Sequence, residues 1–265
     1  MIKLYENGND LVRENRTLLD ANPYLSAFFL LDAPLLTCTD RTNYALRAGE
    51  GENTLLAMKV APYDMLLFGN KDSADELFSY LIGEGYEING LLGSEDVCEA
   101  AADALHAHAG IDYCETLAMD FMECREVTEP SSHAVTTPTE NDLEEILECC
   151  RHFIIDCGLT QTVDPEKTRQ RLSYYRVLRV DGKIVSMACS LPETDKSMKI
   201  CNVYTRPEYR GCGYARQVVN TIKNEILSGG MIATLNVDKK NPISNALYRS
   251  LGFVRVFSQG VFNKI

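Results

Sequence analysis

The chain has 265 residues, of which 45% are hydrophobic, and its net charge is −12. This length suggests one large domain or two small ones, and the composition is ordinary for a globular protein. An acidic chain is a poor candidate for binding nucleic acid or an anionic membrane. No run of about 18 apolar residues predicts a membrane span. The N-terminus also lacks the apolar segment of a signal peptide, so we expect a soluble cytoplasmic protein.

The 10 cysteines are scattered along the chain, without a C-x-x-C pair. We expect them to be reduced thiols that pack as small hydrophobic side chains. A zinc site needs clustered cysteine and histidine residues. The four histidines do not supply such a cluster, so no metal site is predicted.

The first half of the chain predicts alternating strands and helices. Strands are expected at 43–47, 54–60, 63–69, 88–92 and 116–122, and helices at 73–83 and 95–108. The segment 67–73 follows the candidate central strand but has no glycine-rich anion loop. Asp72 and Asp75 lie where phosphate oxygens would have to sit, so this half is not expected to bind a phosphate.

The charge balance of the sequence changes near residue 130, and turn-forming residues cluster there. Residues 1–130 contain 8 Lys+Arg and 24 Asp+Glu, whereas residues 131–265 contain 18 and 14. Turn formers cluster in 129–133 and 136–139. We therefore predict two domains, 1–130 and 131–265. The acidic half would attract a cationic amine at long range, although acidic surface also serves solubility alone.

The second half repeats the same rhythm of elements. Strands are expected at 134–136, 176–180, 183–191, 199–205, 232–237 and 253–262, and helices at 141–156, from 164, at 213–227 and at 242–251. Asp181-Gly182 predicts a tight hairpin. We predict an α/β (α+β) fold, with a mixed, mostly antiparallel central sheet flanked by helices, in both halves.

The segment Arg210–Ala215 joins a predicted strand to a predicted helix. Gly211 and Gly213 let the backbone approach a ligand closely. Successive N–H groups and the helix N-terminus favour an anion, and Arg210 adds a full charge with several donors. These features predict a pyrophosphate site; the alternative is an ordinary glycine turn before a helix.

The pattern Arg-x-x-Gly-x-Ala in this segment resembles the acetyl-CoA-binding motif of the GNAT superfamily of N-acyltransferases. A second block, 241–253, resembles the family's Asn-x-x-Ala-x-x-Leu-Tyr-x-x-Leu-Gly-Phe segment, with Ser244 replacing the usual Ala. The resemblance covers roughly 133–265. It implies transfer of an acyl group from acetyl-CoA, the co-substrate, to an amine. It also implies a tandem protein with a degenerate first half, similar to the glycine N-acyltransferase-like branch.

The resemblance implies particular roles for individual residues. Tyr248 is the expected general acid for the departing thiolate, and the backbone of Val203 and Thr205 is expected to pair with the pantetheine arm. On the helix that carries Tyr248, the spacing predicts a buried stripe of Ile243, Leu247 and Leu251, with Tyr248 outside it. The candidate acyl-CoA contacts are Val203, Tyr204, Thr205, Arg210, Gly211, Cys212, Gly213, Tyr214, Ala215, Asn241, Asn245 and Tyr248.

Three points stay open at the level of sequence. Glu193 and Asp195 are the local carboxylates, but both have the character of solvated hairpin residues, and no base is assigned. The acceptor is expected to be a small-molecule or peptide amine. Whether the protein forms a homodimer stays open. The alternative function is a non-catalytic acyl-CoA sensor or interaction module, whereas a phosphate-loop nucleotidase is disfavoured because Gly-Lys-Ser/Thr is absent.

Overall fold

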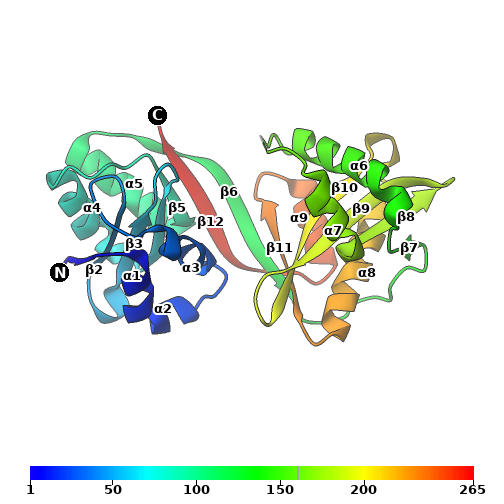
Figure 1. Ribbon diagram of the computed structural model, residues 1–265, viewed down its shortest axis with the longest axis horizontal. Helices are drawn as coiled ribbons and strands as arrows, with labels where there is room; N and C mark the ends of the chain where they lie inside the picture. The colour runs from blue at the N-terminus through cyan, green and yellow to red at the C-terminus, as the bar shows by residue number, and fades with distance from the viewer. Residues whose placement is uncertain (160) are drawn as a thin grey trace. The chain divides into compact units, whose positions relative to one another are not determined.

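The computed structural model describes residues 1–159 and 161–265. Their contacts divide the chain into two compact units (Figure 1): unit 1 contains 1–120, 238–240 and 257–265, and unit 2 contains 121–237 and 241–256. The expected division was a single boundary near residue 130. The observed division differs because the chain enters unit 2 at Phe121 and two later segments return to unit 1.

Unit 1 is built on a sheet with strand order β1-β2-β3-β4-β5-β12. Its neighbours pair antiparallel except β4 and β5, which are parallel. Helices α4 and α5 contribute to one core cluster and α1, α2 and α3 to another. The bounds are β1 Lys3–Tyr5, α1 Gly8–Glu14, α2 Arg16–Asp20, α3 Ala27–Asp32, β2 Tyr44–Ala48, β3 Leu55–Lys59, β4 Met65–Gly69, α4 Ala74–Gly83, β5 Gly90–Ser94, α5 Glu95–Ala109, β6 Tyr113–Cys124 and β12 Val254–Lys264.

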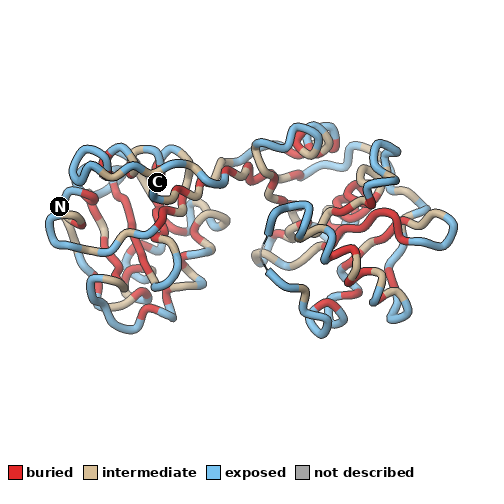
Figure 2. Tube along the Cα trace, turned by 90° about the horizontal axis from the view of Figure 1, so that it is seen from above, coloured by how far each residue is buried: buried red, intermediate tan, exposed pale blue. Residues whose placement is uncertain are grey.

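Unit 2 has the strand order β6-β11-β10-β9-β8-β7, with β10 and β11 parallel. Helix α6 packs in one core cluster, and α8 and α9 pack in a second one. Figure 2 shows that the buried residues follow the strands of each unit. The bounds are β7 Val135–Thr136, α6 Leu143–Asp156, α7 Pro165–Gln170, β8 Tyr175–Val180, β9 Lys183–Pro192, β10 Ser197–Thr205, α8 Tyr214–Ser228, β11 Ile232–Asp238 and α9 Pro242–Ser250.

The predicted mixed, mostly antiparallel sheet flanked by helices is confirmed. Each unit follows one order of elements: three antiparallel strands, a helix, a parallel strand and a second helix (β2-β3-β4-α4-β5-α5 and β8-β9-β10-α8-β11-α9). The hairpin at Asp181-Gly182 is also confirmed, because both residues have positive φ and Val180 pairs with Lys183. The short elements β1 to α3 had no counterpart among the predictions.

The turn-rich stretch around residue 130 is held against α8 by polar side chains. The Lys223 ammonium donates to Thr128 Oγ1 at 2.8 Å, and the Asn224 amide donates to the Glu129 carbonyl at 2.8 Å. Lys223 is fully buried, and burial lowers its pKa. These contacts explain why the stretch belongs to unit 2 instead of forming a linker.

Replacing Lys223 with Met is expected to destabilise unit 2. The substitution removes the buried ammonium donor and keeps a side chain of similar length. The free energy of unfolding should therefore fall by about 1–3 kcal/mol. Urea unfolding followed by circular dichroism measures the change. Lys240→Met, at an exposed position, is the matched control, and an equal effect of the two substitutions would contradict the assigned role.

Candidate functional site

The parallel strands β10 and β11 separate at their carboxyl ends. Their paired residues end at Ile200 and Leu235, although both strands continue beyond this point. We call the region between 201–205 of β10 and 236–237 of β11 the split. Diverging carboxyl ends of parallel strands form a crevice in which sheets of this kind bind ligands. Helices α8 and α9 follow these two strand ends along the chain, so their N-termini lie at the same open end.

The backbone of β10 presents donors to the split. The Arg206 N–H bonds the Val185 carbonyl of β9 at 2.9 Å. Successive peptide groups of a strand point to opposite sides, so the N–H groups of Thr205 and Val203 point away from β9 and into the split. Buried backbone donors require partners. A ligand with amide carbonyls could provide them.

An extra residue interrupts β10 beside the split. Cys201 pairs with Cys189 of β9, but Tyr204 pairs with Met187, so β10 contains one residue more than β9 over this stretch. Asn202 has φ +50°, in the left-handed region that asparagine tolerates better than most residues. A β-bulge bends its strand and disrupts pairing, which accounts for the separation of β10 from β11.

The loop before α8 leaves the helix start without a side-chain cap. The N-cap is Gly213, and both Gly213 and Gly211 have φ +77°. A Cβ atom added at either glycine would meet nothing within 4 Å, so the loop surface is open. The first turn contains no acidic residue. The first N–H groups of a helix have no acceptor within it and attract anions, which supports the predicted pyrophosphate site.

The equivalent helix start in unit 1 has the opposite character. Asn70 Oδ1 accepts the Asp72 N–H at 2.9 Å in the short 3-10 turn that precedes α4. Asp75 and Glu76 occupy the first turn of α4. A capped donor and three carboxylates disfavour phosphate at this position.

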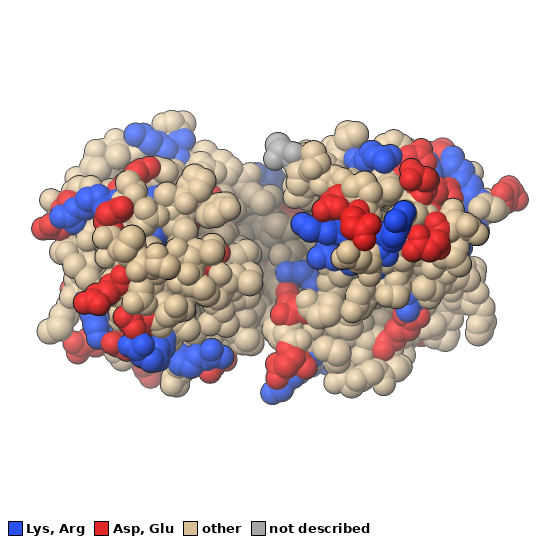
Figure 3. Space-filling model, viewed as in Figure 1, with Lys and Arg blue, Asp and Glu red and all other residues tan. Residues whose placement is uncertain are grey.

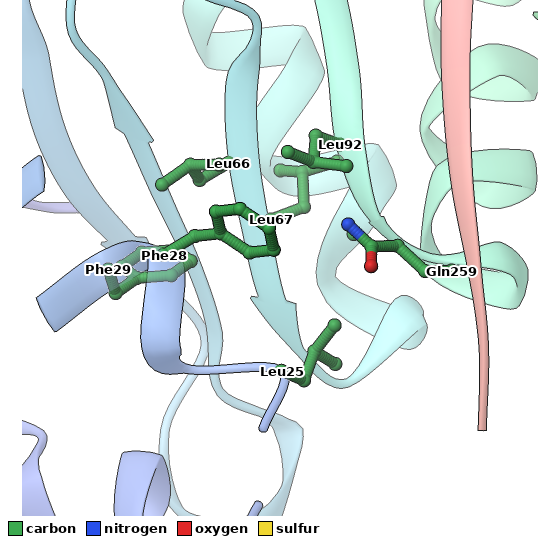
Figure 4. Close-up of a pocket in the computed structure, with 8 residues that line it drawn as sticks. Leu25, Phe28, Phe29, Leu66, Leu67, Leu92 and Gln259 are labelled. Carbon is green, nitrogen blue, oxygen red and sulfur yellow. The ribbon is translucent and has the colours of Figure 1, made fainter. Parts of the chain in front are cut away.

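Unit 1 does contain a shallow pocket, drawn in Figure 4, but its walls carry no charge. Phe28 and Phe29 come from α3, and Leu66 and Leu67 from β4. Gln259 provides the polar side chain. Such walls cannot balance the charge of a phosphate. The remaining lining residues are Leu25, Leu92 and Gly93.

The side chain of Arg210 is engaged by the protein itself. Its Nη2 pairs with Asp156 Oδ2 at 2.5 Å, and its Nε donates to the Thr205 carbonyl at 3.0 Å. The sequence led us to expect this guanidinium at the anion; instead it ties the loop to the C-terminal end of α6. Asp156 is 54 residues distant in sequence, and no sequence pattern marks it as a partner.

The buried face of α9 differs from the predicted one. Ile243 is 81% exposed, whereas Tyr248 is 6% exposed, and Asn245 and Leu251 are also buried. The predicted buried stripe is confirmed at Leu251, and Leu247 packs against the same core cluster. It is wrong at Ile243, which is exposed, and at Tyr248, which was expected outside the stripe and is buried. Helical spacing allows either face of α9 to be buried. In the folded protein the first turn, with Ile243, faces solvent, and Tyr248 faces the core.

Burial determines the acidity of Tyr248. Desolvation, with a smaller contribution from Cys157, raises the pKa of Tyr248 to about 12. Its hydroxyl is therefore protonated at neutral pH, as a proton donor must be. Asn241, in the same block, caps α9: its Oδ1 accepts the Ser244 N–H at 3.0 Å, and its carbonyl accepts the Asn245 side chain at 2.8 Å.

The carboxylate of Glu193 lies at the paired end of β10 and β11. Its Oε1 pairs with Lys199 at 2.8 Å, and its Oε2 accepts the Thr234 hydroxyl at 2.6 Å. Lys199 and Thr234 are partners in the paired region of the two strands. Asp195 is exposed in the turn before β10. Through these contacts Glu193 links β10 to β11, which is a structural role.

Three further features of the described residues concern cysteines, metal ligands and membrane spans. All 10 cysteines are free thiols. Among residues 1–159 and 161–265, no group of three or more His, Cys, Asp or Glu side chains is arranged to hold a metal ion. In the same part of the chain, no helix combines the length and apolar character needed to cross a bilayer.

Comparison with known proteins places this site in a family. Residues 141–253 match the model of the acetyltransferase (GNAT) family. That segment contains β10, the loop Arg210–Ala215, β11 and α9. A search of curated protein sequences returned no match.

Two solved structures resemble the whole chain. One is an acetyltransferase of the GNAT family from Colwellia psychrerythraea, with a TM-score of 0.64, 12% identity and coverage of 100% of this chain and 99% of that one. The other is a GCN5-related N-acetyltransferase from Sphaerobacter thermophilus, with a TM-score of 0.66, 14% identity and coverage of 100% and 95%. At these identities the likeness shows the fold. Residues 141–253, with the split and the uncapped start of α8, form a domain of the acetyltransferase (GNAT) family.

Proposed function

We propose that this protein transfers an acetyl or other acyl group from coenzyme A to a primary amine. The observation that carries the proposal is the uncapped, acid-free N-terminus of α8 at the open end of the split. It combines an anion site with unpaired strand backbone. Acyl-CoA has matching parts, because a pyrophosphate is joined to an arm that contains amides.

Different residues of unit 2 bind different parts of acyl-CoA in this proposal. In this proposal the backbone N–H groups of 211–215 hold the pyrophosphate, with Cys212 contributing its backbone alone. On the acylated pantetheine arm, Val203 offers its N–H group to the thioester carbonyl and Thr205 offers its N–H group to an amide, and Tyr204 lies between them in β10. Asn241 and Asn245 order the start of α9. The Arg210–Asp156 pair fixes the loop in place.

The chemistry is direct attack in a ternary complex. The amine nitrogen forms a bond to the thioester carbon, and the carbon–sulfur bond breaks. The leaving thiolate takes the hydroxyl proton of Tyr248, which is available because the pKa of Tyr248 lies near 12. The proton that the attacking nitrogen loses passes to solvent, and Tyr248 regains a proton from solvent. Holding both reactants in the split makes the attack effectively intramolecular, so no covalent enzyme intermediate is required.

We further propose that unit 1 is a degenerate companion of the same fold, in a tandem arrangement. It has the same order of strands and helices as unit 2. Asp75 and Glu76 lie in the first turn of its α4, so it lacks the anion site. On this view unit 1 is the companion that was expected at 1–130, and unit 2 is the catalytic domain that was expected at 131–265.

The acceptor class in this proposal is a small-molecule or peptide amine, in a monomer or a homodimer. The acidic excess of residues 1–130 does not form a continuous patch on the face drawn in Figure 3, where blue and red side chains lie near one another on unit 1. Ion pairs such as Lys3–Glu14 and Arg16–Asp20 account for this mixing. On this face the charges of unit 1 are therefore mixed and do not form a single acidic surface.

Replacing Gly213 with Glu is expected to weaken acetyl-CoA binding at least about 100-fold, since a like charge facing pyrophosphate costs several kcal/mol. Isothermal titration calorimetry measures the Kd. Gly182→Glu is the matched control. Gly182 also has positive φ, +81°, and open space around it, so both variants carry a similar backbone strain of about 1–2 kcal/mol.

Equal affinities for Gly213→Glu and Gly182→Glu would refute the assignment of the loop. Tight binding of acetyl-CoA by the wild type, without release of thiol across a broad panel of amines, would instead favour the non-catalytic sensor.

Replacing Tyr248 with Phe is expected to lower kcat by about 10–100-fold, at the low end of general acid effects because a thiolate leaves readily. The KM for acetyl-CoA should change little. In the wild type, the raised pKa keeps the acid form present above the ordinary value of 10.0, so Tyr248 should cause no loss of kcat up to about pH 11. Tyr63→Phe, at an exposed position of unit 1, is the control. An unchanged kcat in Tyr248→Phe would contradict the role, and a descending limb near pH 9 that disappears in Tyr248→Phe would contradict the raised pKa.

A further inference from the structure

We propose that Tyr175 is a positioning residue for acyl transfer. Its hydroxyl holds Asn202 in the left-handed conformation that forms the bulge of β10, and so directs the Val203 N–H into the split. This inference rests on the proposed function, because it concerns the same site. The hydrogen bond between Asn202 and Tyr175 is called the clamp below.

The contacts of the clamp are specific. Asn202 Nδ2 donates to the Tyr175 hydroxyl at 3.1 Å, and Cys150 Sγ lies 3.5 Å from the same oxygen. Tyr175 is 3% exposed. It begins β8 and pairs with Cys189 of β9, which pairs with Cys201 of β10. The tyrosine thus lies in the same row as the bulge, two strands away.

The conformation of Asn202 explains why a clamp is needed. A non-glycine residue with φ +50° is strained relative to extended backbone. A side-chain hydrogen bond available only in this conformation offsets the strain. Without it, β10 would gain by straightening and by continuing its ladder with β11 beyond Ile200, because unpaired backbone groups favour any available partner.

Closing the bulge would remove a donor from the reaction. The Val203 N–H immediately follows Asn202 and faces the split. In the proposed reaction it donates to the thioester oxygen as negative charge develops there, and such a donor acts mainly in the transition state. The clamp should therefore affect kcat more than the binding of acetyl-CoA, whose pyrophosphate contacts lie in a separate loop.

The test combines Tyr175→Phe, Asn202→Ala and the double variant, assayed by thiol release with an amine accepted by the wild type. Each single variant should lower kcat about 10–100-fold with a nearly unchanged KM for acetyl-CoA. The double variant should fall no further than the singles, because both remove one interaction. Tyr174→Phe, at the neighbouring and more exposed tyrosine, is the matched control and should keep the wild-type kcat.

Amide hydrogen exchange over 200–206 provides a readout that does not depend on activity. Tyr175→Phe should change the exchange rates of the amides in this segment, and Tyr174→Phe should leave these rates unchanged. Unchanged kcat in Tyr175→Phe, fully additive losses in the double variant, or unchanged exchange would each overturn the clamp. A wild type that releases no thiol would overturn the proposed function, while the exchange result would still decide whether the clamp holds the bulge.

Discussion

The end of pairing between β10 and β11, after Ile200 and Leu235, is the constraint on which the rest of unit 2 depends. Backbone N–H and C=O groups that leave a ladder must find other partners. Here the bulge at Asn202 ends the ladder, and the two helices that follow the separated strands begin at the open end. This local irregularity thus lies where the pairing between β10 and β11 ends.

The two units differ at the start of one helix, although they follow the same order of elements. Both place a helix after the third strand of an antiparallel set. In unit 2 that helix begins at Gly213, which has no side chain to occupy the first N–H groups. In unit 1 the helix also lacks a side-chain cap, but Asp75 and Glu76 lie in its first turn. The charge at the helix start, rather than topology, distinguishes the two units.

Helix α6 and strand β8 support the site from outside it. Asp156, at the end of α6, pairs with Arg210, and Tyr175, at the start of β8, bonds Asn202. The buried Arg206 extends this support, since it pairs with Glu148 of α6 at 2.8 Å. The loop and the bulge are therefore both fixed to elements that precede them in the chain. Preorganised donors of this kind contribute to catalysis because they need no rearrangement during the reaction.

Local sequence signals determined much of this protein. Periodicity and turn residues were sufficient for the order of strands and helices from β2 onward, and Gly211 and Gly213 for the turn before α8, because these features depend on neighbouring residues. Tertiary structure alone decided that Tyr248 is buried and Ile243 exposed, and that residues 257–265 belong to unit 1. It also decided the pairing of Arg210 with Asp156 and of Asn202 with Tyr175. These outcomes depend on contacts between residues distant in sequence, and helical or strand spacing allows more than one face to be buried.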